Sequence, residues 1–278
     1  TVIDAPFPTT PWSPLKGLWS SSLSADQYVE YVERIRESVA EGWVYQVNAC
    51  RRLTHSDDGQ SLRGLFSEIL KKNPAPWASY FEVPGVMIAS ASPELFLSRN
   101  GSTVKSSPIK GTQATNSQQF GAKDQAENVM IVDLMRNDLG QICKSGTVEV
   151  PRLLSSEEHP GLQHLVSDVQ GELLEGISWK QIFTALSPPG SVSGAPKSSA
   201  TQVIGENEIV RGPYCGALGW IQGDQAVLSV AIRTFWKDTN INFGTGAGIT
   251  WGSDARAEWE ETQLKAKRLI SIAGGELQ

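Results

Sequence analysis

The succession of predicted strands joined by tight turns constrains the fold of this chain more than any other feature. Residues 77–90 predict two short strands that turn at Pro84-Gly85, and residues 94–99 lead through Asn100-Gly101 into a strand at 103–109. An Asn-Gly pair between alternating stretches is a strong hairpin signal. Tight turns join antiparallel strands, whereas parallel strands need a long crossover. The pattern therefore favours an α+β protein with antiparallel sheets over a regular βαβ alternation.

The other predicted elements are separated by capping and turn residues. Residues 1–22 are rich in Pro, Ser and Trp and predict an extended lead-in. Capping residues and helical spacing predict helices that begin after Ser24, span 61–72, 122–143 and 179–186, follow Pro196, and run from 254 to about 272. Strands are predicted at 44–53, 146–154, 163–173, 214–222, 226–236 and 240–245.

Composition excludes several classes of protein. The 278 residues include 24 Lys and Arg against 30 Asp and Glu, a formal charge of −6, with 40% apolar residues. This balance fits neither disorder nor a general nucleic-acid binder, which carries a basic excess. No apolar stretch approaches a membrane span, and no leader opens the chain, so we expect a cytoplasmic protein. The length suits one large domain or two small ones.

Cysteines and glycines give weaker signals. Cys50, Cys143 and Cys215 are odd in number and widely spaced, which favours reduced, buried thiols over disulfides or a zinc site. The glycine-rich stretches 190–198 and 244–248 match neither a phosphate loop nor a dinucleotide loop in spacing. As two glycine-rich loops that permit close backbone approach, they still suggest a small anionic ligand.

Paired carboxylates suggest a metal site. Asp124 and Glu127 lie three residues apart on one predicted helix, and Glu258 and Glu261 repeat this spacing on another. Such pairs share a helix face, and carboxylate oxygens suit Mg²⁺. A solvated helix face is the alternative interpretation of the same spacing.

Four other residues could carry chemistry. Lys110, at the end of an apolar strand, is a nucleophile or base if desolvated, and otherwise a lysine that extends to solvent. Glu94, after Ser92-Pro93, is a candidate acid with a raised pKa or an ordinary turn carboxylate. His164 lies in an apolar run and suits the core. Arg233, between Ile232 and Thr234, calls for an anion such as a ligand carboxylate.

Six motifs in one order resemble the chorismate-utilising enzyme family. They are Pro-Ile-Lys-Gly-Thr at 108–112, Ala-Glu-Asn-Val-Met-Ile-Val-Asp-Leu-Met-Arg-Asn-Asp-Leu-Gly at 126–140, Gln-His-Leu-Val-Ser at 163–167, Gly-Ser-Val-Ser-Gly-Ala-Pro-Lys at 190–197, Ala-Ile-Arg-Thr at 231–234 and Gly-Ala-Gly-Ile at 246–249. The family includes anthranilate synthase component I, aminodeoxychorismate synthase component I, isochorismate synthase and salicylate synthase. The resemblance runs from about residue 45 to about residue 270.

The resemblance implies a fold and a set of site residues. It implies one chorismate-binding catalytic domain over 1–278, with 1–43 as a reduced N-terminal portion, built from two packed antiparallel sheets with helices outside. Implied ligands of Mg²⁺ are Glu127 and Glu261, with Glu258 nearby and Asp124 as a weaker candidate. Implied substrate residues are Arg233, Tyr214, Lys197 and the backbone of Gly246, Ala247 and Gly248, with Thr112 and His164 beside the ring.

Lys110 and Glu94 indicate the subfamily. Pro-Ile-Lys-Gly-Thr is typical of aminodeoxychorismate synthases, whereas anthranilate synthases have Ala in place of Lys110. The implied mechanism has Lys110 attack C2 of chorismate while Glu94 protonates the leaving C4 hydroxyl, and ammonia then adds at C4. A neutral amine and a protonated acid need opposite pKa shifts, which a desolvated site provides.

Other family members remain as alternatives. Isochorismate and salicylate synthases also carry a lysine here, as a base for water, and Ser193 is more like anthranilate synthase. A chorismate-binding module without turnover is the non-enzyme alternative. The resemblance further implies a separate glutaminase subunit as the ammonia source, because no motif of such a subunit occurs in the chain.

Overall fold

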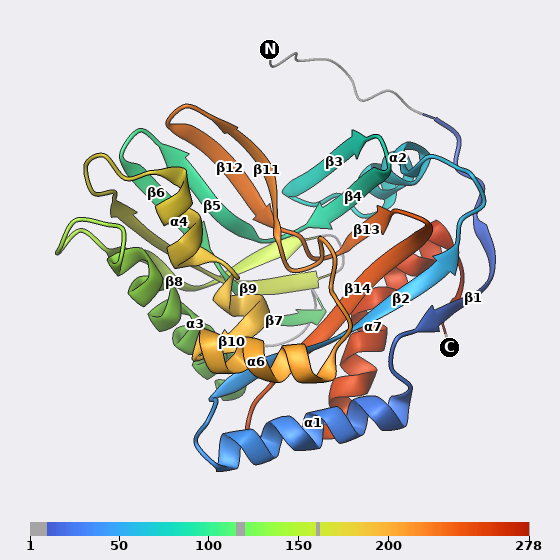
Figure 1. The fold of residues 1–278 in the computed structure, drawn as a ribbon, viewed down its shortest axis with the longest axis horizontal. Helices are drawn as coiled ribbons and strands as arrows, with labels where there is room; N and C mark the ends of the chain where they lie inside the picture. The colour runs from blue at the N-terminus through green and yellow to red at the C-terminus, as the bar shows by residue number, and fades with distance from the viewer. Residues whose placement is uncertain (1–9, 115–119, 160–161, 278) are drawn as a thin grey trace.

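The computed structural model describes residues 10–114, 120–159 and 162–277. It contains two sheets that diverge toward the top of Figure 1, with helices on their outer sides. The predicted α+β class, with two packed antiparallel sheets, is confirmed. Among the described residues, no helix is long and apolar enough to cross a membrane.

The first sheet is built around the long pair β2 (Gln46–Ser56) and β14 (Asn240–Ile249). Its order is β15-β1-β2-β14-β13-β4-β3, and β10 also pairs with β2. The other strands are β1 (Leu15–Ser21), β3 (Trp77–Val83), β4 (Val86–Ser92), β10 (Gly194–Ala195), β13 (Thr234–Lys237) and β15 (Gly274–Leu277). These strands pair antiparallel, apart from β1 with β15, where Leu15 lies opposite Gly274 in a parallel pair. The Trp19 indole donates to the Gly274 carbonyl at 2.9 Å and secures this closure.

The second sheet has the order β11-β12-β5-β6-β9-β7, with β8 also paired to β9. Its pairs are antiparallel. The strands are β5 (Leu95–Asn100), β6 (Thr103–Ser107), β7 (Ile109–Ala114), β8 (Glu149–His159), β9 (Leu162–Glu172), β11 (Ala217–Gln222) and β12 (Gln225–Val230). Strand β9 pairs with β6, β7 and β8 and therefore joins β7 and β8 to the rest of the sheet.

The helices cover both sheets. The first sheet packs against α1 (Ala25–Ala40), α2 (Leu62–Lys72) and α7 (Ala255–Ala273). The second packs against α3 (Ala122–Gly140), which contacts α4 (Trp179–Leu186), while α5 (Gly190–Ser193) and α6 (Lys197–Asn207) contact β2. Ser24 begins α1 with a capping box to Gln27, and Asp254 caps α7, as their sequence positions predict.

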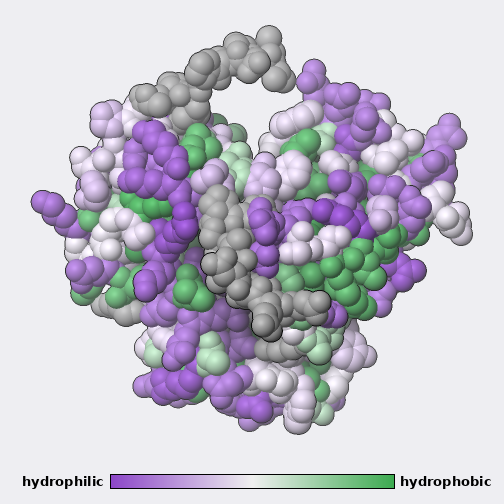
Figure 2. Space-filling model, turned by 180° about the vertical axis from the view of Figure 1, so that it is seen from behind, coloured by the Kyte–Doolittle hydropathy of each residue, from purple (hydrophilic) through white to green (hydrophobic). Residues whose placement is uncertain are grey.

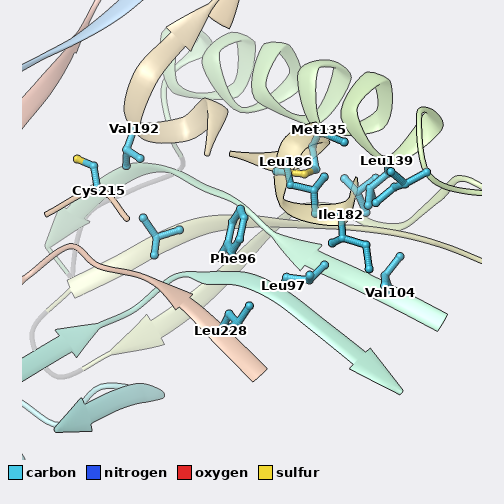
Figure 3. Close-up of a cluster of buried hydrophobic side chains, with 14 of the residues drawn as sticks. Phe96, Leu97, Val104, Met135, Leu139, Ile182, Leu186, Val192, Cys215 and Leu228 are labelled. Carbon is cyan, nitrogen blue, oxygen red and sulfur yellow. The ribbon is translucent and has the colours of Figure 1, made fainter. Parts of the chain in front are cut away.

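One core cluster joins the two sheets. Phe96 and Leu97 of β5 pack with side chains of α3 and α4, among them Met135 and Ile182 (Figure 3). Trp236 of the first sheet belongs to the same cluster. Two further clusters lie between the first sheet and its helices. Burial of this apolar surface fixes the sheets against each other.

Four predicted elements differ from the structure. The strand predicted at 103–109 ends at Ser107, and β7 follows it, while the glycine-rich loop at 190–198 forms α5, β10 and the start of α6. The stretch 226–236 is two strands rather than one, because Arg233 has a φ of 53° that breaks the extended backbone between β12 of the second sheet and β13 of the first. Residues 244–248 form a strand and not a loop, since β14 continues to Ile249 against β2.

The surface is notched where the sheets diverge. Figure 2 shows two lobes separated by a notch at the upper edge of the molecule. In Figure 1 the same region lies between the β11–β12 hairpin and the β3–β4 hairpin. Hydrophilic and hydrophobic residues are interspersed over the face seen in Figure 2.

Candidate active site

Lys110 lies where β7 faces the glycine-rich part of β14. A Cβ built on Gly248 would be 3.2 Å from the Lys110 Nζ, so the absence of a side chain at Gly248 gives the ammonium room to approach β14. The next residue, Gly111, has a φ of 81° at an irregularity of the β7–β9 register. Glycine adopts this positive φ without strain. It also lets the start of α3 pack close by, since a Cβ on Gly111 would be 3.0 Å from the Cβ of Asp124.

The charges around Lys110 come from several elements. Burial lowers the pKa of the Lys110 ammonium from its usual value, and the nearby charge of Lys265 lowers it further. Glu127 of α3, Glu94 and Glu261 of α7 act in the opposite direction. The result is an amine that loses its proton more readily than an exposed lysine.

Glu94 is the buried acid of the site, with 4% of its surface exposed. Its Oε1 accepts a hydrogen bond of 2.6 Å from the Ser191 hydroxyl, and the Ile109 N–H also donates to the carboxyl group. Burial raises the pKa of Glu94 to about 7, although both hydrogen bonds and the Lys110 charge oppose the shift. The site therefore contains the opposite pKa shifts that the sequence predicts.

Gly246, Ala247 and Gly248 present backbone rather than side chains. They pair with Cys50, Ala49 and Asn48 of β2. In the described sheet, β13 pairs with β14 only from Ile241 to Phe243, so β14 extends past its neighbour on that side. An extended glycine-rich strand with an open edge can offer N–H groups to an anion.

Arg233 and Tyr214 also lie together. Burial lowers the pKa of the Arg233 guanidinium, while the nearby Tyr214 opposes this shift. The Tyr214 ring lies against β14, since a Cβ on Gly244 would be 2.2 Å from its Cγ. A buried guanidinium beside this phenol suits a carboxylate ligand.

The predicted metal ligands lie on two helices, α3 and α7. Glu127 and Glu261 come from different helices, and the charge of each raises the pKa of the Lys110 ammonium. Asp124 contacts Gly111, whereas Glu258 is 4% exposed and lies close enough to Tyr28 to raise its pKa. Among the described residues, no three His, Cys, Asp or Glu side chains group closely enough to hold a metal by themselves. Two convergent carboxylates nevertheless fit Mg²⁺, which commonly takes one or two carboxylates and completes its shell with water and substrate.

Three other predicted residues have distinct positions. The Lys197 ammonium donates to the Asp138 carboxylate at 2.8 Å and to the Ala185 carbonyl at 2.9 Å, so it ties α6 to α3 and α4. His164 is buried on β9, opposite Thr112 of β7 in the strand register. The Thr112 side chain lies outside the described part of the structure.

Three residues escaped the sequence analysis. Gln46 is 1% exposed, and neither its amide oxygen nor its nitrogen has a hydrogen-bond partner among the residues that the structure describes. Its nitrogen would be 2.3 Å from a Cβ on Gly248, which puts it beside Lys110. Lys265 donates to the Gly246 carbonyl at 3.1 Å and pairs with Glu261 at 2.5 Å. Ser191 holds Glu94. Ser191 lies within the motif at 190–197, which could have pointed to it, whereas Gln46 and Lys265 lie outside the six motifs.

Comparison with known proteins gives the family to which the chain belongs. Residues 2–271 match the chorismate binding enzyme family, and the chain belongs to that family. It is 34% identical over 270 residues to anthranilate synthase component 1 of Saccharolobus solfataricus, covering 92% of this chain and 64% of the relative. It is also 34% identical over 267 residues to aminodeoxychorismate synthase component 1 of Escherichia coli, covering 91% of this chain and 58% of the relative.

A solved structure agrees with the sequence relatives. Anthranilate synthase component I from Streptococcus pneumoniae superposes with a TM-score of 0.85 at 30% identity, over 96% of this chain and 62% of that one. The chain thus spans between half and two thirds of the length of these relatives. Relatives named for two different products are equally similar to it.

Proposed function

We propose that the protein acts as aminodeoxychorismate synthase component I, converting chorismate and ammonia to 4-amino-4-deoxychorismate. The observation that carries the proposal is the pairing of Lys110, whose pKa is lowered, with Glu94, whose pKa is raised to about 7. A relative at 34% identity is an aminodeoxychorismate synthase component 1. The product would supply p-aminobenzoate for folate.

The proposed chemistry runs in two displacements. The neutral Lys110 amine forms a bond to C2 of chorismate, the ring double bonds shift, and the C4 hydroxyl leaves as water with the proton of Glu94. Ammonia then forms a bond to C4, the double bonds shift back, and the C2–N bond to Lys110 breaks. The ammonium group formed at C4 returns a proton to Glu94, so the cycle balances without a redox partner.

Substrate binding in this proposal uses the remaining site residues. Arg233, Tyr214 and the β14 backbone would hold the pyruvyl carboxylate, and the unpaired Gln46 amide would donate to substrate or ammonia beside Lys110. Glu127 and Glu261 would hold Mg²⁺, which would neutralise the ring carboxylate. We also propose a cytoplasmic setting and a glutaminase subunit as the source of ammonia.

Product analysis tests this function. Purified protein would be incubated with chorismate, Mg²⁺ and an ammonium salt at slightly alkaline pH, with an ammonium-free control, and products separated by chromatography and mass. Ammonium-dependent 4-amino-4-deoxychorismate supports the proposal. Anthranilate, or isochorismate or salicylate in both tubes, would assign another reaction, and chorismate binding without turnover would indicate a binding module.

The role of Lys110 needs a separate test. After a rapid acid quench during turnover, mass spectrometry of the peptide that contains Lys110 should detect a chorismate-derived adduct. Lys110→Ala should abolish both adduct and aminodeoxychorismate, while Lys180→Ala, at an exposed lysine of α4, should change neither. Full aminodeoxychorismate output from Lys110→Ala would exclude the nucleophile.

A further inference from the structure

The short helix α5 places a buried hydroxyl against the acid of the site. Ser191 is 5% exposed, and its Oγ donates to the Glu94 Oε1 at 2.6 Å. The two residues are far apart in the sequence, and Ser191 lies in a glycine-rich stretch whose spacing matches no phosphate loop. We therefore interpret the Ser191–Glu94 hydrogen bond through the chemistry of Glu94 rather than through phosphate binding.

The position of the Ser191 hydroxyl is fixed by its neighbours. Gly190 lies so close to α3 that a Cβ would be 2.3 Å from the Leu134 Cδ2, and Val192 is buried in the core cluster shown in Figure 3. Gly194 lies directly against β2, where a Cβ would be 2.1 Å from the Gln46 carbonyl oxygen. A hydroxyl held by packing on both sides loses little further freedom when it donates to Glu94.

We propose that Ser191 is the positioning residue of the general acid, fixing which oxygen of Glu94 carries the proton. A protonated carboxyl accepts hydrogen bonds at its carbonyl oxygen and donates from the other. Because Ser191 donates to Oε1, the proton is directed to Oε2, the oxygen that would then donate to the leaving hydroxyl. This proposal rests on the proposed function, in which Glu94 is the acid.

The same hydrogen bond influences the pH at which Glu94 is active. The groups that act on Glu94 are the Ser191 hydroxyl, the Ile109 N–H and the Lys110 charge, and each favours the ionised carboxylate. Loss of the Ser191 donor therefore raises the pKa of Glu94 further and extends the protonated form to higher pH.

Ser191→Ala tests the assignment through its pH profile. We expect kcat to fall about ten-fold to a hundred-fold with little change in KM, while the alkaline limb of kcat moves up by about one pH unit. Ser191→Thr keeps a hydroxyl and should restore both. Ser193→Ala is the matched control, because Ser193 lies on the same helix but donates to the Pro189 carbonyl at 2.9 Å. A slower enzyme with an unmoved limb would overturn the proposal.

A second measurement does not depend on the reaction catalysed. The carboxylic C=O stretch of Glu94, identified by its loss in Glu94→Gln, can be titrated by infrared difference spectroscopy without substrate. The midpoint should rise in Ser191→Ala and stay near the wild-type value in Ser191→Thr and Ser193→Ala. If the midpoint rises but the wild-type protein makes another product, the proposed function fails while the Ser191–Glu94 coupling holds. An unchanged midpoint would overturn the coupling whatever the product is.

Discussion

At the scale of single residues, burial acts on two ionisable groups in opposite directions. The pKa of Lys110 is lowered and that of Glu94 is raised because removal from water disfavours both charged forms. The same desolvation that prepares a neutral nucleophile thus prepares a protonated acid. Neither group needs a dedicated partner to reach its reactive form.

Glu94 should reduce the stability of the protein at neutral pH. Its pKa rises from 4.5 to about 7 on folding, so the folded protein keeps a proton that the unfolded chain releases between these values. Stability is then fully present below about pH 4.5 and declines as pH rises to about 7, by about 3 kcal/mol at ~1.4 kcal/mol per pH unit. Glu94→Gln should abolish this decline while it removes activity.

Urea unfolding between pH 4.5 and 8 measures this difference. The free energies of unfolding of wild type and Glu94→Gln should diverge as pH rises, with the variant more stable at pH 8. Glu175→Gln, at an exposed position, should follow the wild type. Parallel curves for wild type and Glu94→Gln would contradict the raised pKa.

The sequence predicted the residues whose chemistry is visible in a motif. Lys110 and Glu94 carried such a signal, as did Arg233. Gln46, Ser191 and Lys265 were missed because their significance depends on partners distant in the chain, such as Gly248 for Gln46 and Glu94 for Ser191. The roles of all the predicted site residues, the metal ligands included, stay predictions.

At the scale of elements, the glycines of β14 leave room for the side chains of the site. Gly248→Ala would insert a methyl group 2.3 Å from the Gln46 amide nitrogen and 3.2 Å from the Lys110 Nζ. We expect kcat/KM to fall at least about a hundred-fold, with a stability loss of about 1–3 kcal/mol from overpacking. Gly252→Ala is the control, because a Cβ there meets no atom within 4 Å. Equal kinetics for the two variants would show that β14 does not form the site.

The ion pair between Lys197 and Asp138 joins α6 to α3, and Lys197 also donates to the Ala185 carbonyl of α4. The side chains of Lys197 and Asp138 are 18% and 2% exposed. Lys197→Met would therefore leave a buried carboxylate without its partner and lower the free energy of unfolding by about 3–5 kcal/mol. Adding Asp138→Leu should restore most of the stability, measured by thermal or urea unfolding. If the double variant also regains turnover, Lys197 is structural; if it is stable but inactive, the predicted substrate role holds.

Local elements were predictable and their pairings were not. The helix at 179–186 and the turn at Pro84-Gly85 agree with the sequence because capping and turn chemistry are local. The alignment of β2 with β14 depends on contacts almost two hundred residues apart, and glycines in a strand interior look like a loop. The break at Arg233 had no local signal, since a φ of 53° is unusual for arginine.

At the scale of the whole molecule, the site draws on both sheets. Lys110 and Glu94 belong to or adjoin the second sheet, while Gly248 belongs to the first. A ligand held between them should stabilise the protein as a unit. Chorismate with Mg²⁺ at about 100 times its Kd adds ~2.7 kcal/mol, which raises the Tm of a chain this size by roughly 5 °C.

A thermal scan checks this prediction with two probes. Tryptophan fluorescence and circular dichroism should shift together with chorismate and Mg²⁺, and Mg²⁺ alone should produce a smaller shift. A shift in one probe only would mean that the ligand stabilises one sheet without the other.

The pairing of β1 with β15 places the first and last strands that the structure describes side by side. Leu15 lies opposite Gly274, and the Trp19 indole donates to the Gly274 carbonyl. A protein in which these ends are linked, and the chain is opened instead at the Pro84-Gly85 turn between exposed Val83 and Val86, would keep the strand order around Lys110. The order of the motifs along the chain is thus only one of several orders that this arrangement of strands allows.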